Sequence, residues 1–371
     1  MAEAASLQPL IVVAAGGTGG HLFPAEALAV ALKARGARVE LATDDRAARY
    51  AGGFPAESII TFPAATPSGR SPIAAAKALL TLARGFFTAR KRLAASRPAV
   101  VVGFGGYPTV PPLLAASTLK LPVVIHEQNA VLGRANAFLA RRATAIATGF
   151  PEVGKVPDDV KSRITHVGNP VRPAIRQAAL VPYPTFEAGG KLHLLVTGGS
   201  QGARVMSDIV PQAIALLPET LRSRLSVVQQ ARAEDIERVR GTYRDLGVDA
   251  VAESFFADLP DRMAAAHLMI GRAGASTVAE LAVIGRPAIL VPLPGSLDQD
   301  QAANAAVLER AGGATAVRQP DFTPQWLAGE LEKRFNNPDS LRQTAQAAST
   351  AGHADAAERL AELVLDIAQR G

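Results

Sequence analysis

Short apolar runs and longer helical repeats alternate along the first part of the chain. Residues 10–14 form an apolar run of strand length, and residues 24–35 carry a helical repeat of apolar positions that stops at Gly36. Further strand-like runs follow, separated by helical patterns, at residues 39–43, 99–102 and 122–125. Strands that alternate with helices predict a parallel sheet with helices on both faces.

The same pattern then starts again. Residues 192–197 form an apolar run, Gly-Gly-Ser-Gln-Gly follows at 198–202, and a helical repeat covers residues 203–217. Later strand-like runs, again between helical patterns, lie at residues 226–228, 268–270 and 288–291. The chain therefore predicts two Rossmann-like, doubly wound parallel-sheet α/β domains in tandem.

The domain boundary is expected within residues 168–190, which contain four prolines and a Gly-Gly pair. We divide the chain into residues 1–170 and 171–371. The last predicted helix, at 354–370, has one apolar face that must pack on another element, and the first domain is one candidate. The residues of this face are Ala357, Leu360, Leu363, Val364 and Ile367.

Composition excludes several classes of protein. The 371 residues are 48% apolar, enough for two cores, and they include no cysteine, so disulfides and thiolate metal sites are excluded. Six histidines show no metal-ligand spacing, so no metal site is expected. The first eight residues hold no basic residue, unlike a signal peptide. The longest uncharged run, 98–119, holds four prolines and three glycines, which favour strand, turn and helix start over a membrane span. We expect a soluble or peripheral cytoplasmic protein.

The formal net charge is +6, and the basic residues are unevenly distributed. Between residues 58 and 151 the one acidic residue is Glu127, among eleven lysines and arginines. Such a one-sided charge attracts phosphate or an anionic surface, although a solvated basic face is the alternative. Within it, residues 73–93 combine apolar and basic side chains as an interfacial membrane helix does, or as an ordinary surface helix does. The residues concerned are Leu79, Leu80, Leu82, Phe86 and Phe87, with Lys77, Arg84, Arg90, Lys91 and Arg92.

Three glycine-rich turns, at residues 16–20, 103–106 and 198–202, each follow a predicted strand. Glycines let a phosphate approach the backbone, and the unpaired amides of a helix N-terminus bind anions. The P-loop pattern is absent, and Leu22 stands where a dinucleotide fingerprint has its third glycine, although Asp44 is suitably spaced to bind a ribose. The turns therefore predict a phosphate-bearing ligand of another kind.

His21 falls in the first helical turn after the first glycine loop, where it is a candidate general base or else a capping or packing residue. The polar run His-Glu-Gln-Asn at 126–129 directly follows a predicted strand. Ligands bind at the carboxyl ends of parallel strands, so this run is a candidate for the site, with a solvated loop as the alternative.

Six motifs, which cover nearly the whole chain, resemble those of the MurG family, the membrane-associated bacterial glycosyltransferases that make lipid II. In chain order they are GGTGGH (16–21), GFGGYP (103–108), HEQN (126–129), GNPVR (168–172), GGSQGAR (198–204) and GASTVAE (274–280). The resemblance implies the GT-B fold, in which two Rossmann-like domains face each other across a cleft. It also implies an inverting transfer that needs no metal ion and no other cofactor.

The implied donor is UDP-N-acetylglucosamine (UDP-GlcNAc). The implied acceptor is the C4 hydroxyl of MurNAc in lipid I, undecaprenyl-diphosphate-MurNAc-pentapeptide, and the product, lipid II, serves peptidoglycan synthesis. The enzyme would be peripheral on the cytoplasmic face of the inner membrane. Its partners would be anionic lipid and other cell-wall synthesis proteins, and no nucleic acid.

The resemblance places the donor in the second domain. Ser200 would contact the diphosphate, Glu280 the ribose hydroxyls and Phe256 the uracil, while Arg172 would lie near the nucleotide. Gln301 and Asn304 would bind sugar hydroxyls, and Asn129 of the first domain would reach the sugar. The expected donor-binding set is Thr18, Gly19, Gly20, Asn129, Arg172, Ser200, Phe256, Ala275, Ser276, Thr277, Val278, Ala279, Glu280, Gln301 and Asn304.

In the first domain, His21 is the first choice for the base that takes the acceptor's proton, and Glu127 is the second. The acceptor would bind at Gly103, Gly105, Gly106, Tyr107 and Asn136. The chain departs from the usual family pattern at Ser207, where many relatives have asparagine, and at residues 294–297.

Other functions remain open on the sequence alone. A UDP-GlcNAc 2-epimerase would share the fold and the donor domain but needs no lipid-facing surface. A non-catalytic UDP-sugar or membrane-binding module would bind without turnover. A nicotinamide oxidoreductase is disfavoured by the missing fingerprint glycine.

Overall fold

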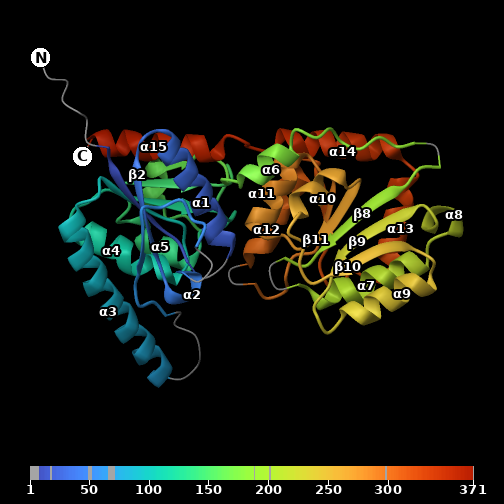
Figure 1. Ribbon diagram of the computed structural model, residues 1–371, viewed down its shortest axis with the longest axis horizontal. Coiled ribbons are helices and arrows are strands. Elements are labelled where there is room, and N and C mark those ends of the chain that lie inside the picture. The colour runs from blue at the N-terminus through green and yellow to red at the C-terminus, as the bar shows by residue number, and fades with distance from the viewer. Residues whose placement is uncertain are drawn as a thin grey trace, which may run out of the picture. The chain divides into compact units, whose positions relative to one another are not determined.

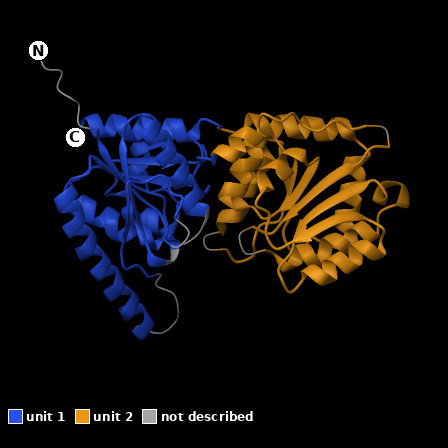
Figure 2. Ribbon diagram, viewed as in Figure 1, with its two compact units in different colours: residues 1–172, 354–371 blue, residues 173–353 orange. Residues whose placement is uncertain are grey.

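The computed structural model describes residues 8–16, 19–48, 52–65, 72–187, 189–199, 202–296 and 299–370, and the chain forms two compact units. Unit 1 runs to Arg172 and takes in the residues from Ala354 onwards, and unit 2 is Pro173–His353 (Figure 2). The division falls two residues after the expected boundary. It also assigns the last helix to unit 1 rather than to the second half of the chain.

The described strands of unit 1 form a seven-stranded, all-parallel sheet in the order β3-β2-β1-β4-β5-β6-β7 (Figure 1). Every neighbouring pair is parallel, for example Val12 beside Glu40 and Val101. The bounds are β1 (Leu10–Ala14), β2 (Arg38–Thr43), β3 (Ser58–Thr61), β4 (Val100–Gly103), β5 (Val123–Glu127), β6 (Ala145–Thr148) and β7 (Ile164–His166).

Helices cover both faces of this sheet because β1 is apolar at every position. Ile11 and Val13 point into one core, which α1 and α15 cover. Val12 and Ala14 point into the core on the other face, which α3, α4 and α5 help to form. The helices are α1 (Gly19–Ala34), α2 (Asp45–Ala48), α3 (Pro72–Ser96), α4 (Val110–Thr118), α5 (Arg134–Ala140) and α15 (Ala356–Arg370), with 3₁₀ turns η1 (Tyr107–Thr109) and η2 (Asp158–Arg163).

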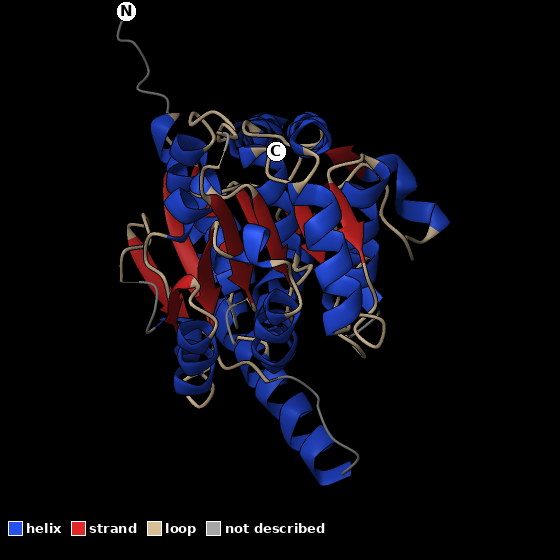
Figure 3. Ribbon diagram, turned by 90° about the vertical axis from the view of Figure 1, so that its right-hand side faces the viewer, coloured by secondary structure: helices blue, strands red, loops and turns tan. Residues whose placement is uncertain are grey.

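The described strands of unit 2 form a six-stranded parallel sheet in the order β10-β9-β8-β11-β12-β13. Helices flank the strands (Figure 3). Its strands are β8 (Leu192–Thr197), β9 (Leu225–Gln230), β10 (Asp249–Glu253), β11 (Leu268–Gly271), β12 (Ala288–Leu290) and β13 (Ala314–Ala316). Its helices are α6 (Pro173–Ala178), α7 (Arg204–Ala215), α8 (Glu219–Arg222), α9 (Ile236–Asp245), α10 (Leu259–Ala265), α11 (Ala275–Ile284), α12 (Asp300–Arg310), α13 (Pro324–Phe335) and α14 (Pro338–Thr350). The predicted pair of parallel-sheet α/β units is confirmed.

The helix predicted at residues 24–35 begins earlier than expected. α1 starts at Gly19, so Pro24 lies inside the helix rather than at its first position. Gly19 and Gly20 have no side chain, so an apolar repeat cannot detect them. The earlier start places His21 in the first turn of α1.

The uncharged run 98–119 folds as predicted into a strand, a turn and the start of a helix, here β4, η1 and α4. Among the described helices, none is long and apolar enough to cross a membrane.

Candidate active site

The carboxyl ends of three neighbouring strands bring the polar motifs of unit 1 together. β1, β4 and β5 are adjacent in the sheet, and each is followed by one of these motifs. β1 precedes the glycine loop and α1, β4 precedes Phe104–Gly106, and β5 ends within His-Glu-Gln-Asn. Ligands of parallel α/β folds bind at this edge, so these loops form the first part of the candidate site.

His21 lies against the glycine turn that follows β4. Its Nδ1 is 2.9 Å from Oε1 of Gln128. A Cβ atom built on Gly106 would come within 3.5 Å of Nε2, and one built on Gly105 within 3.6 Å of Cε1. Both glycines have positive φ, 82° for Gly105 and 76° for Gly106, a backbone conformation that residues with side chains rarely adopt. The two glycines thus let the turn form and leave room for the imidazole.

Glu127 is buried, and four donors occupy its two carboxylate oxygens. The backbone N–H of Asn129 and its side-chain amide donate to Oε1 at 2.9 and 3.1 Å. The backbone N–H of Gly133 and the amide of Asn136 donate to Oε2 at 2.9 and 2.8 Å. A carboxylate accepts about four hydrogen bonds, so Glu127 shapes the loop before α5 and has little accepting capacity left.

Asn136 combines that bond with a polar atom that lacks a partner. Its Oδ1 is buried and has no hydrogen-bond partner among the described residues. A Cβ atom on Gly105 would lie 3.3 Å from its Nδ2 and 3.7 Å from its Oδ1. Asn136, Gly105 and His21 therefore lie close together, and the binding of the acceptor to Asn136 and Gly105 stays a prediction. Tyr107 begins η1 directly after this turn.

His126 is fully buried on β5, behind the candidate base. Its Nε2 lies 3.0 Å from the backbone oxygen of Gly168. Burial lowers the pKa of His126 to about 4, against the raising effect of that hydrogen bond. The imidazole is therefore neutral at physiological pH.

Arg172, the last residue of the N-terminal segment of unit 1, packs on α1. Its guanidinium lies 4.4 Å from the centre of the Phe23 ring, a cation–π distance. Burial raises the pKa of Glu26, also on α1, although the charge of Arg172 lowers it. The expected contact of Arg172 with the nucleotide stays a prediction.

The turn after β8 in unit 2 is a second tight glycine loop. A Cβ atom on Gly198 would lie 2.1 Å from the backbone nitrogen of Ala203, so a side chain there is sterically excluded. Gly199 and Gly202 have φ of 77° and 67°. Ser200 in this loop, like Thr18 in the first glycine loop, lies outside the described residues. Ser207, in the second turn of α7, is buried, and its Oγ has no hydrogen-bond partner in the part of unit 2 that is described.

The loop after β11 leads into the N-terminus of α11. Its first turn, Ala275, Ser276 and Thr277, is partly exposed, while Val278, Ala279 and Glu280 are buried. The amides of a first helical turn have no acceptors within the helix, so they can bind an anionic group. Phe256, which follows β10, is buried beneath the guanidinium of Arg262, 4.5 Å from its ring centre.

Gln301 and Asn304 of α12 bind backbone groups of neighbouring loops. Oε1 of Gln301 accepts from the N–H groups of Ala273 at 3.3 Å and Leu293 at 3.0 Å. Nδ2 of Asn304 donates to the oxygen of Ala273 at 3.2 Å, and Asn304 is fully buried. Their expected bonds to sugar hydroxyls stay predictions, and for Asn304 they require that its surroundings move.

Arg272 is a residue that the sequence did not single out. Its guanidinium donates to the backbone oxygens of Val291 and Pro292 and, at 2.7 Å, to Oε1 of Gln319. Burial lowers the pKa of Arg272. Its place beside GASTVAE was the available signal, because that arginine directly follows a buried strand.

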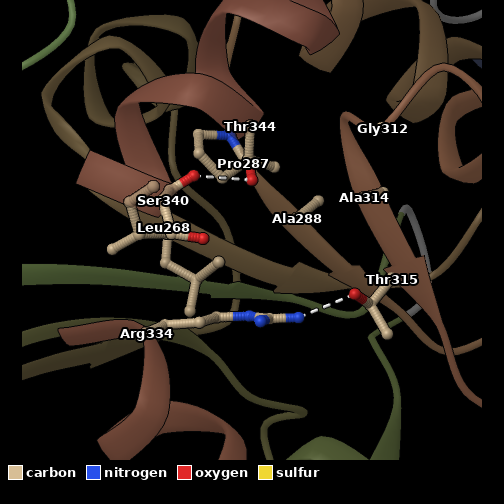
Figure 4. A pocket seen from close by; sticks show the side chains of 10 residues that line it. Leu268, Pro287, Ala288, Gly312, Ala314, Thr315, Arg334, Ser340 and Thr344 are labelled. Carbon is tan, nitrogen blue, oxygen red and sulfur yellow. Dashed lines mark hydrogen bonds between the residues drawn. The ribbon is translucent and has the colours of Figure 1, made fainter. Parts of the chain in front are cut away.

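A small pocket of about 80 Å³ lies at the opposite edge of the second sheet (Figure 4). Arg334 donates to Oγ1 of Thr315 at 2.7 Å and pairs with Glu330 at 3.0 Å. The lining of the pocket includes Ala288 and Ala314, the first residues of β12 and β13. The pocket is therefore not part of the candidate site.

Comparisons with known proteins identify the family. Residues 11–148 match the glycosyltransferase family 28 N-terminal domain, and residues 193–360 match the C-terminal domain of that family. An enzyme of Methylobacterium sp. (strain 4-46), named UDP-N-acetylglucosamine–N-acetylmuramyl-(pentapeptide) pyrophosphoryl-undecaprenol N-acetylglucosamine transferase, is 62% identical over 97% of both chains. The enzyme of the same name from Rhodopseudomonas palustris is 56% identical over 97% of this chain and 99% of its own.

Solved structures agree with this result. The crystal structure of Acinetobacter baumannii MurG superposes with a TM-score of 0.78 at 28% identity, over 97% of this chain and 99% of that one. A putative UDP-N-acetylglucosamine 2-epimerase from Listeria monocytogenes reaches 0.64 over 95% of each chain, and at 15% identity it shows the shared fold alone. Family match, full-length identity and GT-B fold together place the chain in glycosyltransferase family 28 and, within it, in the MurG family.

Proposed function

We propose that the chain transfers N-acetylglucosamine from UDP-GlcNAc to the C4 hydroxyl of MurNAc in lipid I, forming lipid II. The observation that carries the proposal is identity of 62% over 97% of a relative that is named for this reaction. The arrangement of His21 over the Gly105–Gly106 turn, with a buried asparagine beside it, supports a reaction centre in unit 1. Unit 2 then binds the donor.

In the proposed reaction the acceptor hydroxyl attacks the anomeric carbon, and UDP leaves from the opposite face. His21 takes the proton of the hydroxyl. The four donors on Glu127 favour His21 over Glu127 as the base, because those oxygens are already occupied. Glu127 instead holds Asn129 and Asn136 in place.

The departing diphosphate gains negative charge. Amides at the N-termini of α7 and α11 stabilise this charge, and Glu280 of α11 accepts hydrogen bonds from the ribose. Preorganised donors of this kind contribute about 2.7–4 kcal/mol each in oxyanion sites.

Lipid I is anchored in a bilayer, so the acceptor must be met at a membrane surface. α3 supports such a surface: Ile73, Leu79 and Phe87 have exposed fractions of 81%, 68% and 68%. Lys77, Arg84, Arg90 and Lys91 are exposed on the same helix, which projects beyond the other helices of unit 1 (Figure 1). Leu82 and Phe86, expected in this patch, are half-buried, and Phe86 packs against the core of unit 1. We propose peripheral binding to anionic lipid at the cytoplasmic face of the inner membrane. Further cell-wall proteins as partners stay a prediction.

Incubation with radiolabelled UDP-GlcNAc and a lipid I analogue, followed by analysis of the products, tests the function. We expect label in a lipid product only when both substrates are present.

His21→Ala should lower kcat by about 10²–10⁴-fold, the usual contribution of a general base, with donor affinity kept. Interconversion of UDP-sugars without acceptor would indicate a 2-epimerase instead. Binding of UDP-GlcNAc without turnover would indicate a non-catalytic module.

A further inference from the structure

Gln128 lies between two histidines of unit 1, His21 and His126. We propose that Gln128 is a positioning residue that holds His21 in the tautomer with hydrogen on Nδ1, so that Nε2 carries the free lone pair. The series of hydrogen bonds that holds His21 consists of uncharged groups. It begins at the backbone carbonyl of Gly168 and passes through His126 and Gln128. The inference deepens the proposed function, because it gives the candidate base its reactive atom.

The orientation of the Gln128 amide follows from its surroundings. Its Nε2 is 2.9 Å from the backbone oxygen of Phe104 and 3.3 Å from that of His126. Carbonyl oxygens only accept hydrogen bonds, so the NH₂ group must face them. The oxygen Oε1 therefore faces the other way, towards His21. Gln128 is buried, so water does not compete with these bonds.

This orientation determines the tautomer of His21. Oε1 of Gln128 only accepts, and Nδ1 of His21 lies 2.9 Å away, so Nδ1 must donate its hydrogen. A neutral imidazole carries one N–H, and its other nitrogen is then an acceptor. Nε2 is that nitrogen, and it lies at the Gly106 turn. A hydroxyl bound at this turn would meet a lone pair rather than an N–H.

The far end of the chain of bonds is fixed in the same way. Nε2 of His126 lies 3.0 Å from the backbone oxygen of Gly168, so this nitrogen carries the hydrogen of the ring. Its Nδ1 is then an acceptor, 3.3 Å from the NH₂ group of Gln128. The low pKa of His126, caused by burial, keeps the ring neutral. A protonated His126 would present an N–H to the NH₂ group and disrupt the arrangement.

An amide partner has a different consequence from a carboxylate partner. During transfer the O–H bond of the acceptor breaks, its proton bonds to Nε2 of His21, and the freed electron pair forms the bond to the anomeric carbon. The bond from that carbon to UDP breaks at the same time, and UDP keeps the electron pair. His21 becomes an imidazolium, so its bond from Nδ1–H to Oε1 becomes charge-assisted and stronger. Gln128 thus stabilises the protonated base without adding a negative charge beside the departing diphosphate.

The tautomer can be measured directly on the full chain. Long-range ¹H–¹⁵N spectra of protein with ¹⁵N-labelled histidine distinguish a protonated ring nitrogen from a bare one, and comparison with His21→Ala assigns the signal among six histidines. We expect Nδ1 of His21 to be protonated and Nε2 bare. A bare Nδ1 in the wild-type protein would overturn the proposal. This readout needs no turnover, so it stays informative if the proposed reaction fails.

Two variants test the role of Gln128. Gln128→Met removes the acceptor, so we expect a mixture of His21 tautomers and a kcat lowered about tenfold or more, with donor KM and UDP affinity unchanged. Gln128→Glu keeps an acceptor oxygen towards His21, and when protonated it can also donate to the backbone oxygen of Phe104, so it should retain the Nδ1–H tautomer. Gln212→Met, the same change at an exposed position of α7, is the control and should alter neither property. An unchanged tautomer and kcat in Gln128→Met would overturn the proposal. If Gln128→Met does not fold, the wild-type and Gln128→Glu spectra test the proposal: a protonated Nδ1 of His21 in both supports it, and a bare Nδ1 in either overturns it.

Discussion

At the scale of single residues, the candidate site depends on side chains whose polar partners are buried with them. His21, Gln128 and His126 form one chain of hydrogen bonds, and Glu127 binds four donors beside it. The sequence indicated His21 and the His-Glu-Gln-Asn run from their places after strands. It did not indicate the bond between His21 and Gln128, because the two residues are 107 positions apart and only the fold brings them together.

The buried His126 makes the stability of the protein depend on pH. Its pKa is about 4 in the folded chain and about 6.5 when unfolded, so the unfolded chain binds more protons between these values. The contribution of neutral His126 to the free energy of unfolding is fully present above about pH 6.5 and is lost as the pH falls towards 4. The loss amounts to roughly 3 kcal/mol.

We therefore expect His126→Gln to lose less stability than the wild-type protein between pH 7 and 4.5. Urea denaturation at several pH values measures the difference, and comparison of the two proteins removes the contributions of other titrating groups. Parallel curves for the two proteins would contradict the assignment of a buried neutral histidine.

Gly106 is a position where both backbone and space require glycine. Its φ of 76° and ψ of 159° lie in a region that only glycine readily adopts. Gly106→Ala should strain this turn by about 1–3 kcal/mol and move it against His21, lowering kcat/KM for the acceptor while UDP affinity is kept. Gly241→Ala in α9, where a Cβ meets nothing within 4 Å, is the matched control and should preserve activity. Equal kinetics for the two variants would mean that the turn does not serve the acceptor.

At the scale of elements, sequence reasoning found most strands with continuous apolar runs and missed β3, β6, β7, β10 and β13. β1, β8 and β11 are buried at nearly every position, which makes them visible as apolar runs. β3 and β10 lie at sheet edges, where exposed residues alternate with partly or fully buried ones, so their apolar runs are weak. The start of α1 was wrong for a related reason: glycines carry no apolar signal.

α3 is the element for which membrane binding can be tested. Arg90→Glu with Lys91→Glu reverses two exposed charges, and Arg92 is left intact because it pairs with Glu40 at 3.3 Å. A basic residue near anionic lipid contributes about 1 kcal/mol, so affinity for anionic vesicles should fall about thirtyfold or more.

Lys33→Glu with Arg244→Glu makes the same change in net charge at exposed positions on other helices, α1 and α9, and should weaken binding less. Sedimentation with vesicles of defined composition measures both variants. Equal binding of the wild-type protein to neutral and anionic vesicles would speak against the proposed surface.

At the scale of the whole molecule, the chain is two parallel-sheet units, and the first is completed by the last helix. Both parallel-sheet units followed from the repeat of the strand–glycine–helix pattern. The sequence did not determine the unit on which α15 packs, because an apolar helix face shows only that the helix packs on some other element. Leu360 and Val364 are fully buried in the core that α1 and β1 share.

Leu360→Ala should therefore destabilise unit 1 by about 2–5 kcal/mol, the usual cost of a core leucine. Glu362→Ala, at an exposed position of the same helix, should change stability by less than about 0.5 kcal/mol. Amide hydrogen exchange locates the effect: protection should fall in β1 and β4. Loss of protection in β8 and β11 instead would show that α15 stabilises the other unit.

The packing of α15 on unit 1 also bears on the order in which the two units can fold during synthesis. Unit 2 is one continuous stretch, Pro173–His353, whereas unit 1 lacks a wall of its core until residues beyond Ala354 have been made. Domains generally fold as units in the order of synthesis. We expect the reverse order here, because the core between α1 and β1 stays partly uncovered until α15 has been synthesised. A truncation that removes α15 should thus destabilise unit 1, the unit whose synthesis begins first.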